Sequence, residues 1–277
     1  MPCIVLTAFI SFFPTNVSAQ GPKLLEIEKN VELCNRVTPT SADAQITGCS
    51  ALIRSDGQTR KTLAIAHNNR GNAYVTKGEY DRAIQDYDES IKVDPDYPKA
   101  YNNRGLAYQK KGEYERALAD FDQSIKLDPN FASTYVNRAE TYQKKADYDR
   151  AVADYDKAIG LQPKLEGALG GRCRIRAIMG TLPAALADCE RAIQQDPNAA
   201  ITFDARGLIY LKMARWSEAI ADYDSALRLE PKLASSLYGR GVAKNNLGRA
   251  SDGKADMSAA ARLEPKIASY FARYGVK

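Results

Sequence analysis

A period of 34 residues runs through the chain from position 64 to position 267. Six repeats follow one another without a gap, and we number them 1 to 6: residues 64–97, 98–131, 132–165, 166–199, 200–233 and 234–267. Position 32 of every repeat is proline: Pro95, Pro129, Pro163, Pro197, Pro231 and Pro265. Proline lacks a backbone N–H and disfavours helical geometry in the residue before it, so each one ends a helix. Because each repeat in such an array packs on its neighbours, we expect one repeat domain and not two globular domains.

Two further patterns place two helices in each repeat. Positions 4, 7, 8 and 11 have the spacing of one helical face, and positions 20, 24 and 27 mark a second face after a turn at position 15. Small residues occupy positions 8 and 20, where two helix backbones approach closely: Gly71, Gly105, Ala139, Cys173, Gly207 and Gly241, then Ala83, Ala117, Ala151, Ala185, Ala219 and Gly253. Large rings fill most of positions 4, 11 and 24 around this crossing point. We expect each repeat to fold as an antiparallel helical hairpin.

These positions also carry a resemblance to a known family. The pattern resembles the tetratricopeptide repeat, whose signature is an aromatic residue at position 4, Gly at 8, Tyr at 11, Ala at 20, an aromatic residue at 24, Ala at 27 and Pro at 32. The resemblance covers 204 of the 277 residues and implies an all-α, right-handed superhelical solenoid of antiparallel helix hairpins. In repeats 4 and 6, Arg176 and Lys244 replace the tyrosine at position 11. Cys189 and Met257 replace the ring at position 24, so we expect these two repeats to pack more loosely.

Three segments lie outside the array. Residues 3–13 form an apolar run as long as a signal-peptide core, and Val17-Ser18-Ala19 follows it, so we expect a signal peptide at 1–19 with cleavage after Ala19. No Lys or Arg precedes this core, which leaves two alternatives: a start further upstream, or an apolar tail that is no signal. We expect an atypical N-terminal helical hairpin or cap at 20–63 and a C-terminal capping helix at 268–277. The resemblance is thus to an exported, bacterial-type member of the family, periplasmic or secreted.

Four cysteines remain after the expected cleavage, and they allow three pairings. Cys173 and Cys189 occupy positions 8 and 24 of repeat 4, on facing surfaces of its two helices, and Cys34 and Cys49 have nearly the same separation. We therefore expect two disulfides, Cys34–Cys49 and Cys173–Cys189, since an exported protein meets an oxidising compartment. The alternative is four buried free thiols. The spacing lacks the C-x-x-C of a zinc site, so we expect no metal.

Composition argues against several classes of function. A net charge of +5 with no run of five like charges indicates neither a nucleic-acid-binding surface nor a polybasic membrane patch. His67 is the single histidine, so we expect no His-based catalytic triad, no cofactor and no enzyme. Residues 248–255 approximate a phosphate-binding G-x-x-x-x-G-K-S/T loop but lack its final hydroxyl and follow a predicted helix instead of a strand. The run at 3–13 is too short to span a bilayer, so we expect no membrane span in the mature chain.

Polar side chains gather on the predicted concave side, which the first helices of the hairpins line. An asparagine at position 6 recurs as Asn69, Asn103 and Asn137. Each amide offers a donor and an acceptor, so this series can bond successive peptide groups of an extended chain. It resembles the asparagine ladder in the superhelix of O-linked N-acetylglucosamine transferase, which holds extended substrate peptides. The expected peptide-binding set also includes Asn68, Asn72, Lys99, Asn102, Lys110 and Lys144.

Two observations limit this expectation. The ladder stops at Gly171, Ala205 and Gly239, so it supports a site in the N-terminal half only. An Asn-Arg pair is common in this repeat, so the alternative is that these asparagines simply solvate the helix. Co-chaperone members of the family grip a terminal carboxylate through a lysine at position 5, but Asn68 and Asn102 stand there. The set is incomplete, and we do not expect capture of a chaperone tail.

A second series pairs opposite charges. Arginine stands at position 7 of every repeat and aspartate at position 23: Arg70, Arg104, Arg138, Arg172, Arg206 and Arg240, then Asp86, Asp120, Asp154, Asp188, Asp222 and Asp256. An arginine beside the packed face is partly desolvated and needs a partner. We expect repeated Arg–Asp pairs, within a repeat or between neighbours, that hold the stacking register.

The sequence thus predicts a non-enzymatic protein- or peptide-binding scaffold or adaptor of the cell envelope that holds extended segments in a concave groove. The alternative is a structural subunit that oligomerises, or docks in an envelope complex through its convex or terminal faces. The expected partners are proteins or peptides, with a homo-oligomer as one form.

Overall fold

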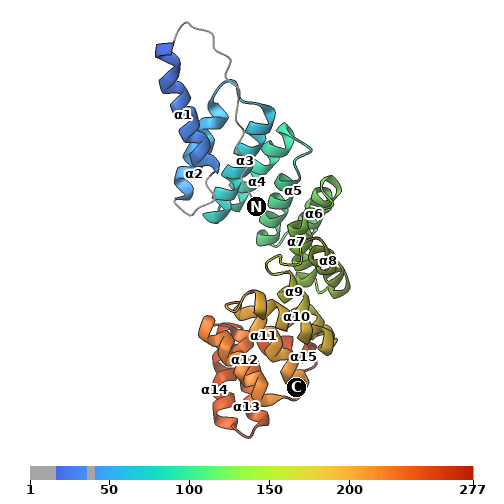
Figure 1. The fold of residues 1–277 in the computed structure, drawn as a ribbon. Coiled ribbons are helices and arrows are strands. Elements are labelled where there is room, and N and C mark those ends of the chain that lie inside the picture. The colour runs from blue at the N-terminus through green and yellow to red at the C-terminus, as the bar shows by residue number, and fades with distance from the viewer. Residues whose placement is uncertain (1–16, 36–40, 277) are drawn as a thin grey trace. The chain divides into compact units, whose positions relative to one another are not determined.

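The computed structural model describes residues 17–35 and 41–276, with side chains from residue 26 onward (Figure 1). Every regular element in these ranges is a helix. The helices are α1 (Val17–Asn35), α2 (Ala42–Arg54), α3 (Arg60–Thr76), α4 (Tyr80–Val93), α5 (Pro98–Lys111), α6 (Tyr114–Leu127), α7 (Ala132–Lys144), α8 (Tyr148–Leu161), α9 (Ala168–Met179), α10 (Leu182–Gln195), α11 (Ala200–Lys212), α12 (Trp216–Leu229), α13 (Ala234–Asn246), α14 (Ala250–Leu263) and α15 (Ile267–Arg273). The expected all-α solenoid of helix hairpins is confirmed. Of the expected signal peptide, residues 1–16 lie outside the described ranges.

The second helix of every repeat ends two residues before the repeated proline. In repeat 1, α4 ends at Val93 before Pro95, and in repeat 6, α14 ends at Leu263 before Pro265. The residue between helix and proline has an extended backbone, with φ −135° and ψ 91° at Asp94. Proline disfavours helical geometry in the residue before it, so the repeated proline sets the length of each hairpin.

The turn at position 15 has a left-handed backbone in every repeat. Glycine occupies it four times, with φ between 75° and 87°, at Gly78, Gly112, Gly180 and Gly248. Ala146 and Ala214 occupy it in repeats 3 and 5, with φ of 58° and 55°. Glycine adopts this conformation at no steric cost, whereas the Cβ of alanine is strained there.

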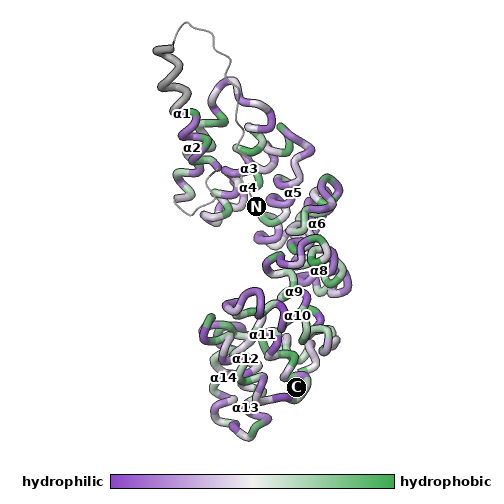
Figure 2. Tube along the Cα trace, viewed as in Figure 1, coloured by the Kyte–Doolittle hydropathy of each residue, from purple (hydrophilic) through white to green (hydrophobic). Residues whose placement is uncertain are grey.

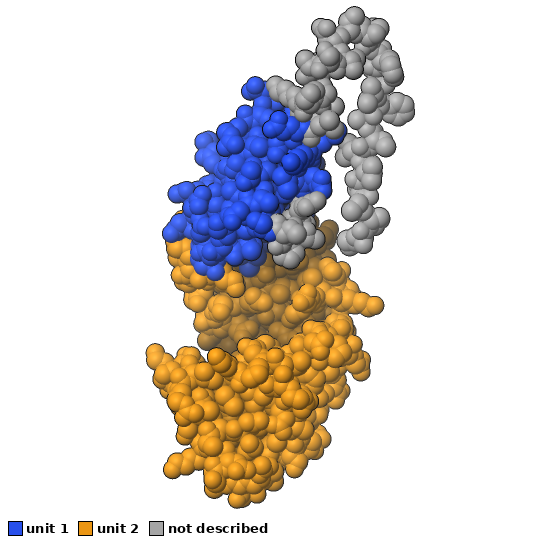
Figure 3. Space-filling model, turned by 90° about the vertical axis from the view of Figure 1, so that its left-hand side faces the viewer, with its two compact units in different colours: residues 1–107 blue, residues 108–277 orange. Residues whose placement is uncertain are grey.

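The chain forms two compact units, unit 1 at residues 1–107 and unit 2 at residues 108–277, with the boundary inside α5 (Figure 3). In unit 1, α1 packs on α2, α2 on α3 and α3 on α4. In unit 2, successive hairpins pack on one another from α7 to α14, and α15 packs on α13 and α14. Hydrophobic and hydrophilic stretches alternate along the helices of each unit (Figure 2), as expected for helices that bury one face.

The glycines at position 8 make room for the rings at position 24. A Cβ at Gly71 would lie 2.6 Å from the ring of Tyr87, and a Cβ at Gly207 would lie 2.8 Å from the ring of Tyr223. Both rings are buried, with 1% and 0% of their residue surface exposed. The expected crossing point of a small residue and a large ring is confirmed at these two repeats.

Both expected disulfides are present. Cys34 of α1 is bonded to Cys49 of α2, with 4.6 Å between their Cα atoms, and Cys173 of α9 is bonded to Cys189 of α10, with 5.3 Å between theirs. All four residues are buried. In repeat 4 the disulfide stands where other repeats pack a ring on a glycine, so a covalent bond closes that hairpin.

The arginine at position 7 joins neighbouring repeats. Arg138 donates from Nε and Nη2 to both carboxylate oxygens of Asp154, at 2.8 and 2.7 Å, and from Nη1 to Asp122 of the preceding repeat at 2.6 Å. The pairs within a repeat are Arg70–Asp86, Arg138–Asp154, Arg172–Asp188, Arg206–Asp222 and Arg240–Asp256, and the pairs with the preceding repeat are Arg104–Asp88, Arg138–Asp122, Arg172–Asp156 and Arg240–Asp224. Both kinds of pair expected from the sequence are therefore present.

Candidate functional site

In unit 1 the expected asparagines bind one another across neighbouring helices. The Asn103 Nδ2 donates to Oδ1 of Asn68 at 2.9 Å and to Oδ1 of Asn72 at 3.1 Å. The Asn69 Nδ2 donates to the backbone carbonyl of Cys34 at 3.3 Å. This network ties α5 to α3, and α3 to α1, so it stabilises the stacking of successive hairpins within unit 1.

Two members of the expected set are buried. Asn68 is 2% exposed and Asn102 is 4% exposed. The Asn68 Nδ2 donates to Asn69 Oδ1 at 3.2 Å, and the Asn102 Nδ2 donates to Asn103 Oδ1 at 3.0 Å. Position 5 of repeat 1 faces position 6 of repeat 2, so helix packing covers it. In this conformation a ligand has no access to the amides of Asn68 and Asn102, contrary to the expectation that they contact a peptide.

The remaining members lie on the surface, in two separate places. In unit 1, Asn69, Asn72 and Asn103 are partly exposed and Lys99 is exposed. In unit 2, Asn137 is partly exposed, and Lys110 and Lys144 are exposed. Their contact with a peptide stays a prediction.

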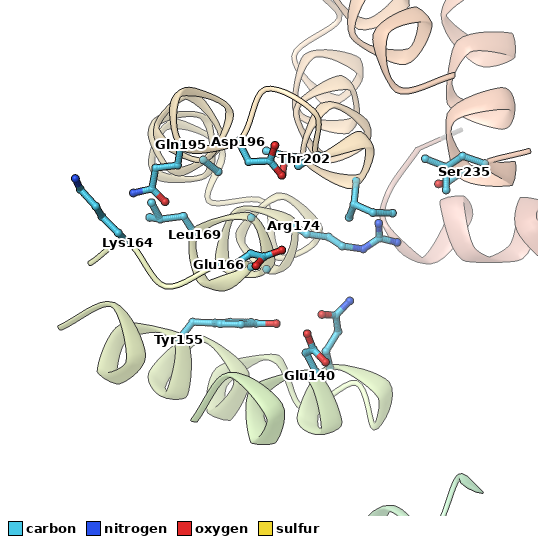
Figure 4. A pocket seen from close by; sticks show the side chains of 18 of the residues that line it. Glu140, Tyr155, Lys164, Glu166, Leu169, Arg174, Gln195, Asp196, Thr202 and Ser235 are labelled. Atoms are coloured by element: carbon cyan, nitrogen blue, oxygen red, sulfur yellow. The ribbon is translucent and has the colours of Figure 1, made fainter. Parts of the chain in front are cut away.

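A cavity of about 790 Å³ opens in unit 2 (Figure 4). Its wall comes from α7, α8, α9, α10, α11 and α13 and from the loop that precedes α9. Figure 4 labels the following residues that line the cavity: Glu140, Tyr155, Lys164, Glu166, Leu169, Arg174, Gln195, Asp196, Thr202 and Ser235. Cavities of this size hold small molecules or a few residues of a peptide.

Two glycines of α9 form part of the cavity wall. Gly170 and Gly171 stand at positions 5 and 6 of repeat 4, where repeats 1 and 2 have asparagines. A Cβ at position 171 would lie 2.4 Å from Cζ of Tyr155, and a Cβ at position 170 would lie 2.9 Å from Oγ1 of Thr202. The Tyr155 ring occupies the space that a side chain at position 171 would need, which explains why the asparagine series stops here.

Charged groups of both signs line the cavity. The Arg174 Nη1 donates to Oδ2 of Asp204 at 3.2 Å, and Oδ1 of Asp204 accepts from the Ser236 hydroxyl at 2.6 Å. Both Asp204 and Ser236 are buried, so this network fixes the guanidinium of Arg174 beside Asp204. The surrounding protein desolvates Glu140 and raises the pKa of its carboxyl, against the opposite effect of Lys110 and Lys144.

The cavity was not predicted from the sequence. The predicted site followed the asparagines into the N-terminal half, whereas the cavity is lined by residues 140–235. The available signal was the Leu169-Gly170-Gly171 stretch, where two consecutive glycines interrupt a helix face that carries polar side chains in repeats 1 and 2.

Two kinds of feature are absent from the described residues. No three His, Cys, Asp or Glu side chains there come together in a way that could hold a metal ion. None of the helices described is both long and apolar enough to cross a membrane.

Family models match four stretches of the chain. The model described as "TPR repeat" matches residues 71–112, and three described as "Tetratricopeptide repeat" match residues 98–131, 132–165 and 205–266. Together these stretches span more than half of the 277 residues. The chain belongs to the tetratricopeptide repeat family. No curated protein sequence matches it.

Solved structures, tetratricopeptide repeat proteins among them, share the fold. A tetratricopeptide repeat protein from Parabacteroides merdae is 19% identical with a TM-score of 0.66, and the match covers 91% of this chain and 98% of that one. Pseudomonas aeruginosa pilF is 16% identical with a TM-score of 0.66, over 79% of this chain and 100% of that one. YrrB, described as a TPR protein with an unusual peptide-binding site, is 19% identical with a TM-score of 0.51, over 67% and 96%.

Proposed function

We propose that this tetratricopeptide repeat protein is a non-enzymatic scaffold of the cell envelope that binds extended segments of other proteins, and that the cavity of unit 2 is its principal binding site. The observation that carries the proposal is the cavity of about 790 Å³, which is lined by charged, polar and apolar groups. The peptide-binding site named for YrrB gives the proposal support from the same fold.

The polar lining indicates how a segment would be held. Amide groups of Gln143 and Gln195 and hydroxyls of Thr202 and Ser235 line the cavity, and these bond peptide groups without regard to the ligand's side chains. Three or four neutral hydrogen bonds worth about 1 kcal/mol each contribute about 3–4 kcal/mol, which alone corresponds to a dissociation constant of about 1 mM or weaker. Ile201 is 45% exposed beside the cavity, and it offers an apolar contact for one ligand side chain. A scaffold that meets several clients suits weak binding of this kind.

The exposed members of the sequence-predicted set serve as additional contacts in this proposal. Asn69, Asn72, Asn103 and Lys99 would act in unit 1, and Asn137, Lys110 and Lys144 in unit 2. Lys144 also lines the cavity, so it belongs to both sets.

Two disulfides support a location outside the cytosol. Structural disulfides persist in secreted and periplasmic proteins and are rare in the cytosol. The Cys34–Cys49 and Cys173–Cys189 bonds both lie in buried positions. We therefore propose that the protein acts in the periplasm or outside the cell.

The experiment selects peptides from a random displayed library against the full chain and measures the affinity of a selected peptide by calorimetry. Ile201→Arg introduces a long charged side chain at the cavity edge, and we expect it to weaken binding at least tenfold. The matched control is Leu263→Arg, because Leu263 is 46% exposed and lies outside the cavity lining. Equal loss in both variants, or in neither, would sink the cavity as the binding site.

A second pair of variants separates the two halves. Asn69→Ala with Asn103→Ala removes amides of unit 1 and leaves the cavity intact. If these variants lose the peptide while Ile201→Arg keeps it, the concave asparagines of unit 1 are the site. If all variants keep their partners, the alternative of a structural subunit that docks through convex or terminal faces gains support.

A further inference from the structure

A second tyrosine of unit 2 packs on a glycine in the same way as Tyr155 packs on Gly171. Tyr155 and Tyr223 both stand at position 24, in repeats 3 and 5, and each ring lies against the glycine at position 6 of the following repeat. A Cβ at Gly171 would lie 2.4 Å from Cζ of Tyr155, and one at Gly239 would lie 2.3 Å from Cζ of Tyr223. The ring of Tyr155 lines the open cavity (Figure 4). Both residues are buried, with 1% of Tyr155 and 0% of Tyr223 exposed, but Tyr223 also lies beside the C-terminal segment.

The C-terminal segment, residues 267–276, which we call the tail, lies on the surface around Tyr223. Phe271 and Tyr274 of the tail line a residual space of about 10 Å³ together with Tyr223, Ile178 and Leu208. That space is about the size of one water molecule, so the two aromatic side chains fill the surface almost completely. Phe271 is 3% exposed, and its ring centroid lies 4.8 Å from that of Tyr238.

The tail fits this surface in shape but leaves one polar group unsatisfied. Among the described residues, the buried hydroxyl of Tyr223 has no hydrogen-bond partner. A buried donor without an acceptor destabilises the arrangement that buries it. An occupant that brings an acceptor to this hydroxyl would therefore suit the surface better than the tail does.

The tail is held by its side chains. Its helix α15 has seven residues, and a helix of that length is not stable by itself in water, so it depends on the packing of Ile267 and Phe271, which are both buried. The tail follows α14 after the break at Pro265. Detachment of the tail therefore does not require any helix of the array to unwind.

We propose that the surface around Tyr223 is a second ligand site, that the tail occupies it as an internal ligand, and that its external partner is a helical segment with two aromatic side chains three residues apart. Phe271 and Tyr274 show this spacing, which places two side chains on one face of a helix. The inference does not depend on what the open cavity binds.

The first test uses the full chain and hydrogen exchange, read out at the amides of residues 267–275. Tyr223→Phe removes the hydroxyl that has no partner while the tail is bound. Water satisfies this hydroxyl when the tail detaches, so the substitution stabilises the tail-bound state relative to the detached state. We expect these amides to exchange about tenfold more slowly in the variant. The matched control is Tyr155→Phe, whose ring lines the open cavity, and it should leave tail exchange unchanged. Unchanged or faster tail exchange in Tyr223→Phe overturns the proposal.

The second test supplies the tail from outside. The probe is a labelled synthetic peptide of residues 264–277, measured by fluorescence anisotropy against the full chain with Phe271→Ala and Tyr274→Ala. We expect this variant to bind the peptide at least tenfold more tightly than the unchanged chain, whose site is occupied. Arg273→Ala, an exposed change in the same helix, should behave as the unchanged chain. No binding by the double variant, with its thermal transition still cooperative, overturns the proposal.

The Ile201→Arg variant separates the two sites. Combined with Phe271→Ala and Tyr274→Ala, it should retain the tail peptide, because Ile201 does not line the surface around Tyr223. Loss of the tail peptide in this combination would show that the tail peptide binds in the open cavity, and the second site would be rejected while the cavity stood.

Discussion

The ring of Tyr155 lies against the backbone of Gly171, where an added Cβ would come within 2.4 Å of the ring. This contact joins the second helix of repeat 3 to the first helix of repeat 4 and forms one wall of the cavity. The absence of a side chain at position 171 is thus a packing requirement.

Gly171→Ala should destabilise the protein by about 1–3 kcal/mol, because an inserted methyl group forces a packed ring to move. Gly160→Ala is the matched control, since Gly160 is an exposed residue of α8 and a Cβ added there would meet nothing within 4 Å. Alanine is the better helix former there and should add about 0.5–1 kcal/mol. Urea unfolding of the two variants should therefore shift in opposite directions.

Glycine and alanine can be exchanged in both directions at the turns of position 15. Ala214 has φ of 55°, so Ala214→Gly should relieve strain and stabilise the protein by about 1 kcal/mol. Gly78 has φ of 75° with no neighbour within 4 Å, so Gly78→Ala should cost a similar amount through backbone strain alone. Thermal unfolding checks both, and a loss of stability in Ala214→Gly would contradict the strain argument.

The buried Arg–Asp pairs should matter far more than the exposed ones. Arg206→Ala removes the partner of Asp222, whose side chain is 7% exposed, and an unpaired buried carboxylate costs about 3 kcal/mol. Arg215→Ala breaks a pair with Glu218 whose side chains are 47% and 46% exposed, and exposed pairs are worth about 1 kcal/mol at most. If denaturant midpoints of the two variants fall equally, the arginine series does not stabilise the stacking.

Acid should weaken unit 1 through Asp86. Burial disfavours its charged form, but hydrogen bonds from Arg70 and His67 outweigh this effect and lower the pKa of Asp86. Its stabilising contribution is therefore present above the unfolded-state pKa of about 3.9 and is lost as the pH falls through the lower folded-state pKa. We expect the free energy of unfolding to decrease below about pH 4.

Asp86→Asn tests that account. The variant should be less stable at pH 7 and should lose less stability than the unchanged chain between about pH 4 and pH 2. Asp56→Asn changes an exposed carboxyl and should leave the pH profile as it is. Parallel profiles for all three chains would show that Asp86 does not carry the acid sensitivity.

The helix hairpins, the disulfide pairs and the Arg–Asp pairs were predictable because each follows from residues at repeated positions. Cys173 and Cys189 replace a glycine and a ring that face each other in other repeats, so their pairing could be inferred without coordinates. The buried state of Asn68 and Asn102 could not, since it depends on how closely position 5 of one repeat approaches position 6 of the next.

The cavity and the surface around Tyr223 could not be predicted from the sequence for a related reason. Both depend on the tyrosines at position 24, and the direction of a ring relative to the following repeat is not contained in a spacing pattern. Residues 268–277 were predicted to cap the array, and α15 does pack on α13 and α14. That Phe271 and Tyr274 also reach Ile178 and Leu208 depends on the packing of distant repeats.

The arginine at position 7 favours changes of the array by whole repeats. Arg138 binds a carboxylate 16 residues before it and another 16 residues after it, and the same two separations recur at Arg172 and Arg240. A duplication or deletion of one whole repeat keeps these separations, whereas a shift of one helix along its neighbour would leave a partly buried arginine without a partner. The length of this protein can therefore change during evolution in steps of 34 residues at little cost in stability.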